Sequence, residues 1–350
     1  MAVVRIDGSM GEGGGQVLRT ALTLSMCLKQ PIAVSNIRAG RKKPGLLRQH
    51  LAALKAAAEI SDAELEGAEL GSTEIGFIPG VVRSGSYEFK IGSAGSTTLL
   101  AQTIIPALGL LKEQSKLTVH GGTHNGMAPS VEFVELALAP LLKRAGLTVN
   151  SHLLRYGFYP NGGGTWRAKV EPWSNARFVE LAVRGKPVSR EAVATISNLQ
   201  SHVGERELER VAKKMSWPSE ELALKEVTAP GPGNLLSLRC AYENITEVFE
   251  SVGSIGLSAE RVAGRAIRDA KRYMQSEHAV GEYLADQLLL PLVLGAGGVF
   301  TTGPLSSHCR TNMLLINQML GADYFEVTEE MTDTGPHSTV TIPKGLALAH

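Results

Sequence analysis

Short glycine-rich turns, each leading into an apolar helix, recur along this chain and constrain its fold more than any other feature. Residues 11–15 (GEGGG) precede a helix predicted over 16–28, and residues 92–96 (GSAGS) precede one over 97–111. Residues 279–281 (AVG) precede a third, over 282–294. Each helix is followed by a strand, a loop and a second helix. The consistent order predicts an internal repeat of units too long for a solenoid, packed as a pseudo-symmetric assembly.

Each repeated unit contains two helices that can cover one face of a sheet, which predicts an α/β (α+β) fold with three such units. Residues 1–183 and 278–350 are expected to form one large domain. The strand and second helix of the units are predicted at 31–37 and 46–60, at 116–120 and 130–145, and at 298–302 and 309–320. A hairpin of residues 324–328 and 338–342 is expected to complete the last sheet.

Residues 184–277 interrupt the repeat and predict a small inserted α/β domain. A charged amphipathic helix is expected over 189–217, a strand over 235–241 and a strongly basic helix over 258–274. This segment contains no motif that indicates chemistry.

Composition indicates an ordinary soluble protein, with 43% hydrophobic and 20% charged residues in a chain of 350. Three widely spaced cysteines favour reduced thiols and a cytoplasmic location. The apolar run at 288–295 is too short to span a bilayer, and the N-terminus lacks the apolar core of a signal peptide. We therefore expect no membrane partner.

The net charge of +1 gives no general sign of nucleic-acid binding, but the charge is unevenly distributed. Residues 1–60 carry nine Lys/Arg against three Asp/Glu, whereas residues 61–90 carry two against six. A local basic patch of this kind suits a few phosphates rather than a long duplex.

The glycine clusters do not match the common nucleotide-binding motifs. A Walker phosphate loop is absent, and the clusters lack the third glycine of the dinucleotide fingerprint. Glu12, however, lies inside a glycine turn, where a carboxylate can hold a magnesium ion that arrives with phosphate. Arg19, Arg38, Arg41 and Gln49 follow, and guanidinium groups match phosphate oxygens. Together they predict a phosphate site.

His308 follows a turn at Gly303-Pro304 and comes directly before an apolar helix that is predicted to begin at Cys309. A neutral imidazole there is a good nucleophile, and backbone N–H groups at a helix start suit phosphate. The alternative is a capping or buried histidine. His120 and His124 are separated by two glycines, so a loop without metal is favoured for them.

Eight long stretches identify a resemblance over nearly the full length, weakest across residues 184–277. They are GEGGGQVLRTALTLS (11–25), IRAGRKKPGLLRQHLAALKAA (37–57), GSTEIGF (71–77), GSAGSTTLLAQTIIPAL (92–108), GGTHNGMAP (121–129), YGFYPNGGG (156–164), VGEYLADQLLLP (280–291) and TGPLSSH (302–308). With these stretches the chain resembles the RNA 3′-terminal phosphate cyclases.

The resemblance implies a large domain of three units, each similar to the C-terminal domain of a translation initiation factor, with a smaller domain inserted before the last unit. It implies an ATP-dependent enzyme of the ligase class that acts on RNA carrying a 3′-phosphate end. That end becomes a 2′,3′-cyclic phosphate, and AMP and pyrophosphate are released. The intermediates are a covalent histidine–AMP and an adenylylated RNA 3′-end.

The resemblance also implies roles for individual residues. His308 is the nucleophile that accepts AMP, and Glu12 holds Mg²⁺ or Mn²⁺. Arg38, Arg41 and Gln49 are candidates for the RNA 3′-phosphate, with Arg19 nearer ATP or the metal. The ATP site is expected to be lined by Gln102, Pro129, Tyr283, Leu284, Ala285, Asp286 and Gln287. Tyr283 either stacks on adenine or is a core or interface aromatic, and Asp286 either holds a ribose hydroxyl or contacts a helix end.

Two other classes of protein compete with this interpretation. One is a non-catalytic ribosome-assembly relative of the same fold, which would lack the nucleophilic histidine. The other is a carboxyvinyl or related transferase, which would bind small anionic substrates without a nucleotide adduct. Nucleotidyl transfer through lysine is disfavoured because the sequence contains no K-x-D-G motif. A homodimer is a further expectation.

Overall fold

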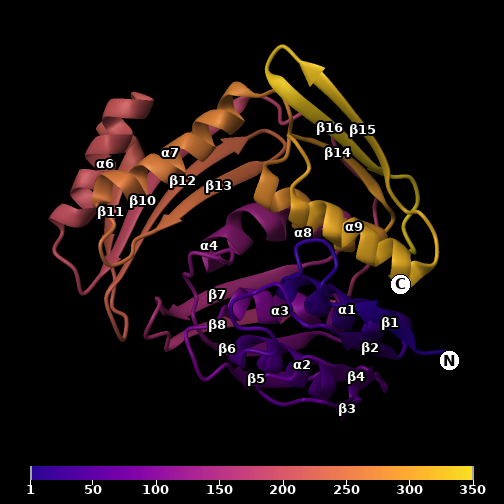
Figure 1. The fold of residues 1–350 in the computed structure, drawn as a ribbon. Helices are drawn as coiled ribbons and strands as arrows, with labels where there is room; N and C mark the ends of the chain where they lie inside the picture. Colours follow the sequence, from indigo (N-terminus) through magenta and orange to yellow (C-terminus); the bar gives the residue numbers. More distant parts are fainter. Residues whose placement is uncertain (1, 349–350) are drawn as a thin grey trace.

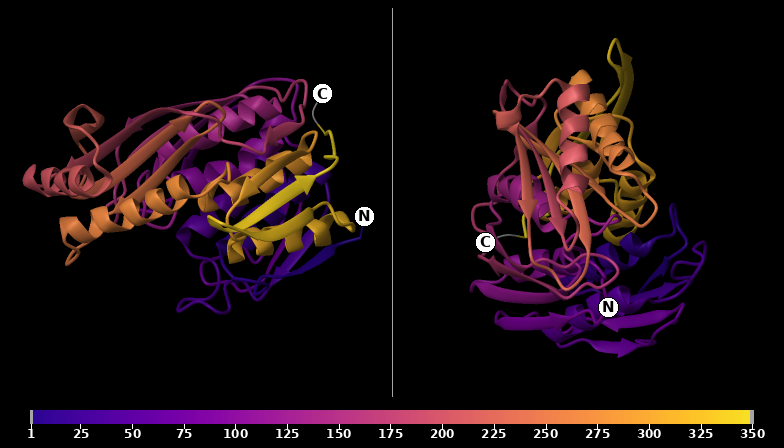
Figure 2. Two further views of the ribbon diagram at one scale, coloured as in Figure 1. Left: turned by 90° about the horizontal axis from the view of Figure 1, so that it is seen from above. Right: turned by 90° about the vertical axis from the view of Figure 1, so that its left-hand side faces the viewer.

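A computed structural model describes residues 2–348 and confirms the mixed α/β class. In the described residues, the strands form four sheets of four strands, with helices packed against them (Figure 1). The views in Figure 2 show the sheet and helices of residues 187–275 projecting from one side of the molecule. No helix within residues 2–348 is both long enough and apolar enough to cross a bilayer.

Three of the sheets share one strand order, in which the first pair is parallel and the next two pairs are antiparallel. The first consists of β1 (Val4–Asp7), β2 (Ile32–Ser35), β4 (Ile75–Ile78) and β3 (Glu64–Glu66). The second consists of β5 (Ser86–Lys90), β6 (Ser115–Gly121), β8 (Gly164–Val170) and β7 (Val149–Arg155). The third consists of β9 (Val179–Leu181), β14 (Gly298–Thr302), β16 (Gly335–Ile342) and β15 (Glu326–Thr332).

Two helical segments accompany each of these sheets. They are α1 (Gly15–Leu28) and α2 (Arg48–Ser61) in the first unit, and α8 (Glu282–Leu294) and α9 (Ser307–Leu320) in the third. The second unit has α3 (Thr97–Gly109) and a continuous segment made of α4 (Val131–Phe133), the π-helical turn η1 (Val134–Leu138) and α5 (Ala139–Ala145). The predicted helix over 282–294 is confirmed to the residue, and the predicted C-terminal hairpin is present as β15 and β16.

The fourth sheet lies between β9 and α8 in the sequence. It consists of β11 (Leu222–Glu226), β10 (Pro187–Ser197), β12 (Gly233–Tyr242) and β13 (Thr246–Val252), in that order. Helices α6 (His202–Met215) and α7 (Ala259–Gln275) and the short 3-10 helix η2 (Ser219–Glu221) complete this region. Because β9 pairs in parallel with β14, the third unit starts before this segment and resumes after it.

The predicted helix over 189–217 is wrong in its first half. Residues 187–197 form β10, and the helix α6 begins only at His202. Residues 192–197 of this strand are all buried, so both of its faces are covered there. A strand buried on both faces has no alternating polar pattern, which is why its sequence was read as a helix.

Packing between helices of different units brings the glycine turn before α1 close to the start of α9. α1 packs against both α3 and α9, so the glycine turn before α1 comes to lie beside the start of α9. One hydrophobic cluster joins the three units, whereas the inserted sheet has a second cluster with α6 and α7. The edge strand β13 also contacts η1, which places the inserted sheet against the second unit.

Candidate active site

The glycine turn before α1 packs directly onto α9. Gly11 has a positive φ of 55°, and a Cβ there would lie 2.0 Å from Thr311 Oγ1 on α9. The backbone N–H of Glu12 donates to the same Thr311 Oγ1 at 3.2 Å. Only glycine permits both this backbone conformation and this close approach. The turn thereby carries the Glu12 side chain to the first turn of α9.

His308 lies in that first turn of α9, after Ser306, whose hydroxyl accepts the Cys309 N–H and caps the helix. The helix begins at Ser307, so His308 is helical rather than the last residue of a loop. Its Nε2 is 2.9 Å from Glu12 Oε2, and its Nδ1 is 3.0 Å from Gln16 Oε1. The side chain is 49% exposed. A capping or fully buried histidine is therefore excluded, because the ring is accessible and held on two sides.

Arg41 completes a group of charged side chains around Glu12. Its Nη2 is 2.8 Å from Glu12 Oε1 and also donates to the Glu12 backbone carbonyl at 3.3 Å. A Cβ on Gly14 would lie 3.1 Å from the same guanidinium nitrogen, so this glycine leaves room for the arginine. Glu12, Arg41 and His308, which are widely separated in the sequence, therefore meet in one ionic cluster.

Gln16 links His308 to Asp286 on α8. Its amide oxygen faces His308 Nδ1, and its amide nitrogen donates to Asp286 Oδ2 at 3.2 Å. Because the amide oxygen can only accept, this contact needs a proton on Nδ1, while the Glu12 carboxylate opposite Nε2 is an acceptor as well. The sequence analysis did not single out Gln16. Its spacing of three residues from Arg19 on α1, which puts both side chains on one helix face, was the available signal.

Burial shifts the pKa values of the charged groups behind Gln16. Desolvation raises the pKa of Asp286 to about 7, against the opposing effect of the Arg19 charge and the Gln16 hydrogen bond. Desolvation lowers the pKa of Arg19 to about 10, and Asp286 limits that fall. Arg19 therefore remains a cation at neutral pH, whereas Asp286 can exchange a proton there.

His50 is a second residue that the sequence analysis missed. It is buried, and desolvation together with the nearby Arg19 and Arg38 charges lowers its pKa to about 3. A Cβ on Gly15 would lie 2.4 Å from its Nε2, so the first residue of α1 must be small. The neutral His50 ring therefore adds no further charge near Arg19 and Arg38.

Arg38 and Gln49 lie near this cluster but make other contacts. The Arg38 guanidinium donates to the carbonyls of Lys43 and Gly45, and burial and the Arg41 charge lower its pKa. Gln49 accepts the Ser96 backbone N–H at 3.2 Å and so joins α2 to the second glycine-rich turn. Neither side chain contacts His308 within the described residues.

A cavity of about 570 Å³ opens beside His308. Five of the residues expected around ATP line it: Gln102, Pro129, Tyr283, Asp286 and Gln287. Gln102 donates to Gln287 at 2.7 Å, and the Tyr283 side chain is 57% exposed, which excludes a core role for it. Leu284 and Ala285 do not line the cavity. Their side chains are buried, because they occupy the core-facing side of α8.

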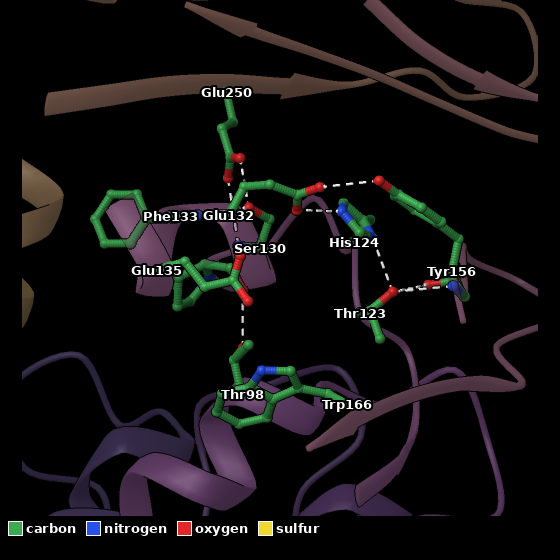
Figure 3. Close-up of polar contacts among 12 residues, drawn as sticks. Thr98, Thr123, His124, Ser130, Glu132, Phe133, Glu135, Tyr156, Trp166 and Glu250 are labelled. Carbon is green, nitrogen blue, oxygen red and sulfur yellow. Dashed lines mark hydrogen bonds and ion pairs between the residues drawn. The ribbon is translucent and has the colours of Figure 1, made fainter. Parts of the chain in front are cut away.

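The cavity is also lined by Glu250 of the inserted sheet and by Arg265 and Arg268 of α7. Glu250 accepts from Ser130 Oγ at 2.5 Å and from Ser130 N at 3.3 Å (Figure 3). Desolvation raises the Glu250 pKa to about 7, despite the Ser130 hydrogen bond. This carboxyl group joins β13 to the start of α4, and nothing in the sequence pattern had indicated it.

A histidine outside the cluster at Glu12 also pairs with a glutamate. His124 Nε2 lies 2.5 Å from Glu132 Oε2, and His124 Nδ1 lies 2.7 Å from Thr123 Oγ1 (Figure 3). The His124 side chain is fully buried. Burial would raise the Glu132 pKa, but the hydrogen bond and charge of His124 outweigh it and lower the pKa to about 2.

Glu12 is the only residue predicted from the sequence to bind a metal ion, and it supplies a single carboxylate. The described part of the chain contains no group of three or more His, Cys, Asp or Glu side chains that could hold a metal. Mg²⁺ is commonly held by one or two carboxylates together with substrate phosphates and water. Glu12 supplies one such carboxylate, but its two oxygens are paired here with Arg41 and His308, so an ion would have to displace one of these partners.

Comparison with known proteins decides the family. A family model described as RNA 3′-terminal phosphate cyclase matches residues 10–325. The chain belongs to the RNA 3′-terminal phosphate cyclase family. An RNA 3′-terminal phosphate cyclase of Ectopseudomonas mendocina is 47% identical over 323 residues, covering 91% of this chain and 93% of that relative. One of Salmonella typhimurium is 46% identical over 318 residues, covering 91% and 94%.

Among solved structures, an EPSP synthase from Acinetobacter baumannii aligns with 98% of this chain and 64% of its own. The sequence identity is 10% and the TM-score is 0.30. This likeness is too weak to support a shared fold, so membership of the cyclase family rests on the sequence relatives.

Proposed function

We propose that this protein converts RNA 3′-phosphate ends to 2′,3′-cyclic phosphates with ATP, through a covalent histidine–AMP intermediate on His308. Membership of the cyclase family supports the overall reaction. The observation that carries the mechanism is the accessible His308 ring, which lines a cavity of about 570 Å³ and lies between Glu12 and Gln16.

The first step forms a P–N bond between His308 Nε2 and the α-phosphorus of ATP and breaks the bond to the β-phosphate, so that pyrophosphate leaves. The attacking nitrogen needs a free electron pair. Gln16 supports this by keeping the ring proton on Nδ1, and Asp286 in turn fixes the orientation of the Gln16 amide. Glu12 must then turn away from Nε2 before the attack.

In the second step a 3′-phosphate oxygen of RNA displaces His308 from the α-phosphorus, and AMP becomes joined to the RNA end through a pyrophosphate bond. In the third step the neighbouring 2′-hydroxyl attacks the RNA phosphorus, loses its proton and displaces AMP. Splitting the reaction in this way replaces a poor leaving group by AMP. Arg41 is our candidate for the 3′-phosphate, with Arg38 and Gln49 beside it, since a guanidinium can hold two phosphate oxygens.

ATP is proposed to occupy the cavity lined by Gln102, Pro129, Tyr283, Asp286 and Gln287. The exposed Tyr283 ring is available to stack on adenine, and the cationic Arg19 lies on the same wall as Asp286. Leu284 and Ala285 would contribute only their backbone. Mg²⁺ or Mn²⁺ held by Glu12 would supply positive charge for the departing pyrophosphate.

Several wider expectations accompany this proposal. The large domain (1–183 and 278–350) and the inserted domain (184–277) are proposed as separate units, supported by the hydrophobic cluster that the inserted sheet forms with α6 and α7. The likeness of each repeated unit to an initiation-factor domain, the cytoplasmic location and the homodimer stay predictions from the sequence.

The proposal is tested by incubating the protein with ATP, Mg²⁺ and an RNA that ends in a 3′-phosphate labelled on that phosphate. We expect the label to become resistant to phosphatase while remaining on the terminal nucleotide, and one AMP to appear for each end converted. A folded protein that leaves the end sensitive to phosphatase would instead support the non-catalytic alternative. A small anionic substrate consumed without AMP would support a transferase.

A further inference from the structure

Helix α7 of the inserted sheet presents a row of arginines to solvent. Arg261, Arg265, Arg268 and Arg272 are all exposed and follow one another at intervals of four, three and four residues. This spacing places them on one face of the helix. The opposite face is buried against the inserted sheet through Val262, Ala263, Ala266, Ile267, Ala270 and Tyr273. We call Arg261, Arg265, Arg268 and Arg272 the arginine stripe.

Acidic neighbours balance only one end of the stripe. Arg268 pairs with Asp269 at 3.1 Å, and Arg272 pairs with Asp269 at 3.8 Å and with Glu282 at 3.0 Å. Arg261 and Arg265 have no ion-pair partner within residues 2–348. α7 also carries Lys271, and its other acid, Glu260, is already paired with Arg206. The first half of the stripe is therefore an uncompensated positive surface.

The stripe is continuous with the cavity that contains His308. Arg265 and Arg268 line its wall, together with His308, Gln16 and Tyr283. A chain whose 3′-end reaches His308 must leave the cavity, and this wall gives it a positively charged way out. Arginine on both the wall and the outer surface suits a ligand that extends beyond the cavity rather than a small molecule held inside it.

Contacts of the inserted sheet hold the stripe in a fixed position relative to His308. Glu250 of β13 accepts two hydrogen bonds from Ser130 at the start of α4 (Figure 3). Glu247 of the same strand accepts the Gly281 N–H at 2.6 Å, directly before α8. β13 is thus joined to two units of the large domain, and α7 packs on β13. A surface fixed in this way needs no rearrangement to guide a strand into the cavity.

We propose that the arginine stripe binds the backbone phosphates of the RNA nucleotides that precede the reacting 3′-end. This inference rests on the proposed function, since it requires RNA to be the substrate. With a rise of about 1.5 Å per residue, the stripe spans about 16 Å, enough for roughly five phosphates of a stacked strand at about 3.4 Å each. Phosphate contacts carry no base information, so recognition along the stripe is independent of sequence.

The experiment measures binding of a single-stranded RNA of about twelve nucleotides with a 3′-phosphate, by fluorescence anisotropy without ATP over a range of salt concentrations. In the variant R261Q/R265Q we expect affinity to fall about tenfold at low salt. The logarithm of the association constant decreases with the logarithm of the salt concentration. The magnitude of this slope should become smaller by about 1.4, since each lost single-strand phosphate contact removes about 0.7. The matched control K213Q/K214Q removes two exposed lysines from α6, outside the stripe, and should change neither quantity.

Two further comparisons separate this proposal from loss of folding and from failure of the proposed function. R261K/R265K should restore the salt slope, because a phosphate contact needs the positive charge. Thermal unfolding of all variants shows whether each of them is folded. Under cyclisation conditions, the preference for the long RNA over a dinucleotide with a 3′-phosphate should fall in R261Q/R265Q. An unchanged slope in that variant, or equal losses in K213Q/K214Q, would overturn the proposal. Wild-type binding with the expected slope but no cyclisation would contradict the proposed function alone.

Discussion

Two of the histidine–glutamate pairs in this molecule, at His308 and at His124, have similar chemistry but different surroundings. His308 Nε2 lies 2.9 Å from Glu12, with side chains 49% and 28% exposed, whereas His124 Nε2 lies 2.5 Å from Glu132, with side chains 0% and 14% exposed. The His124 pair is closed by Thr123 and Tyr156. The His308 pair lies at an open cavity and shares its carboxylate with Arg41. Accessibility therefore separates a pair that a substrate can reach from one that is enclosed in the fold.

The sequence context of the two histidines does not reveal this difference. Both follow glycine-containing loops, and a helix begins just before His308 and soon after His124. His124, however, packs against the rings of Tyr156 and Phe158, at centroid distances of 4.9 and 5.2 Å. This cover removes water from the imidazole and leaves no space for a substrate. The predictions below test whether the first pair can be altered without loss of stability and the second without direct loss of chemistry.

The largest effect is expected from H308A. Loss of the nucleophile should reduce adenylylation and cyclisation by roughly 10³-fold or more. The free energy of unfolding should change by no more than about 0.5 kcal/mol, as for other accessible positions. The rate of AMP transfer and urea unfolding measure the two quantities. H202A, which removes an exposed histidine of α6, is the matched control and should retain full activity. Activity in H308A comparable to that of the wild-type protein would contradict the proposed mechanism.

H124A should have the reverse effect. Removing the imidazole leaves the Glu132 carboxylate with its strongest partner missing and a cavity beside two aromatic rings. Breaking a buried pair in this way costs about 3–5 kcal/mol, read from the urea midpoint at constant m-value. Protein that remains folded should still accept AMP from ATP. A stable H124A protein that cannot be adenylylated would show that the second pair takes part in the chemistry.

A smaller effect is expected from Gln16, which is proposed to orient the His308 ring. In Q16L the Nδ1 proton loses its acceptor, so we expect adenylylation to slow by about 10- to 100-fold with little change in stability. Q16E keeps an oxygen acceptor opposite Nδ1 and should recover part of the rate. Equal rates in Q16L and wild type would remove Gln16 from the mechanism.

The smallest effect on the reaction itself is expected at Glu250, where the change is a pH dependence of stability. Because folding raises its pKa to about 7, the stability that this group contributes is fully present below its unfolded pKa of about 4.5 and is lost as pH rises through 7. The difference in unfolding free energy between wild type and E250Q should therefore change between pH 4.5 and 7, by at most about 1.4 kcal/mol per pH unit. Parallel stability curves for the two proteins would contradict the account of this carboxyl group.

The fold was predictable where local patterns are strong. Glycine turns followed by apolar helices predicted α1, α3 and α8, since helix periodicity and glycine punctuation are both local signals. Strand β9 has only three residues and was missed, and β10 was mistaken for a helix because it is buried on both faces. Both errors concern strands whose pairing partners lie far along the chain, which a single sequence does not reveal.

The residues of the candidate site could be predicted from the sequence only in part. His308, Glu12 and Arg41 lie together in the structure, and Gln102 and Gln287 lie on the cavity wall, while the roles that the resemblance implies for them stay predictions. Gln16 and His50 were missed because an uncharged side chain gains its importance only from the groups that packing places beside it. Arg38 and Gln49 satisfy backbone groups in the described structure, so their proposed contact with the RNA phosphate requires a direct test.

The central claim is that His308 Nε2 forms a covalent bond to AMP. Its most direct test is incubation of the intact protein with Mg²⁺ and ATP labelled at the α-phosphate, followed by isolation of the modified peptide. The account predicts an acid-labile adduct on the peptide that contains His308, and no adduct in H308A. Label retained in H308A, or mapped to a lysine or to another histidine such as His124, would contradict it.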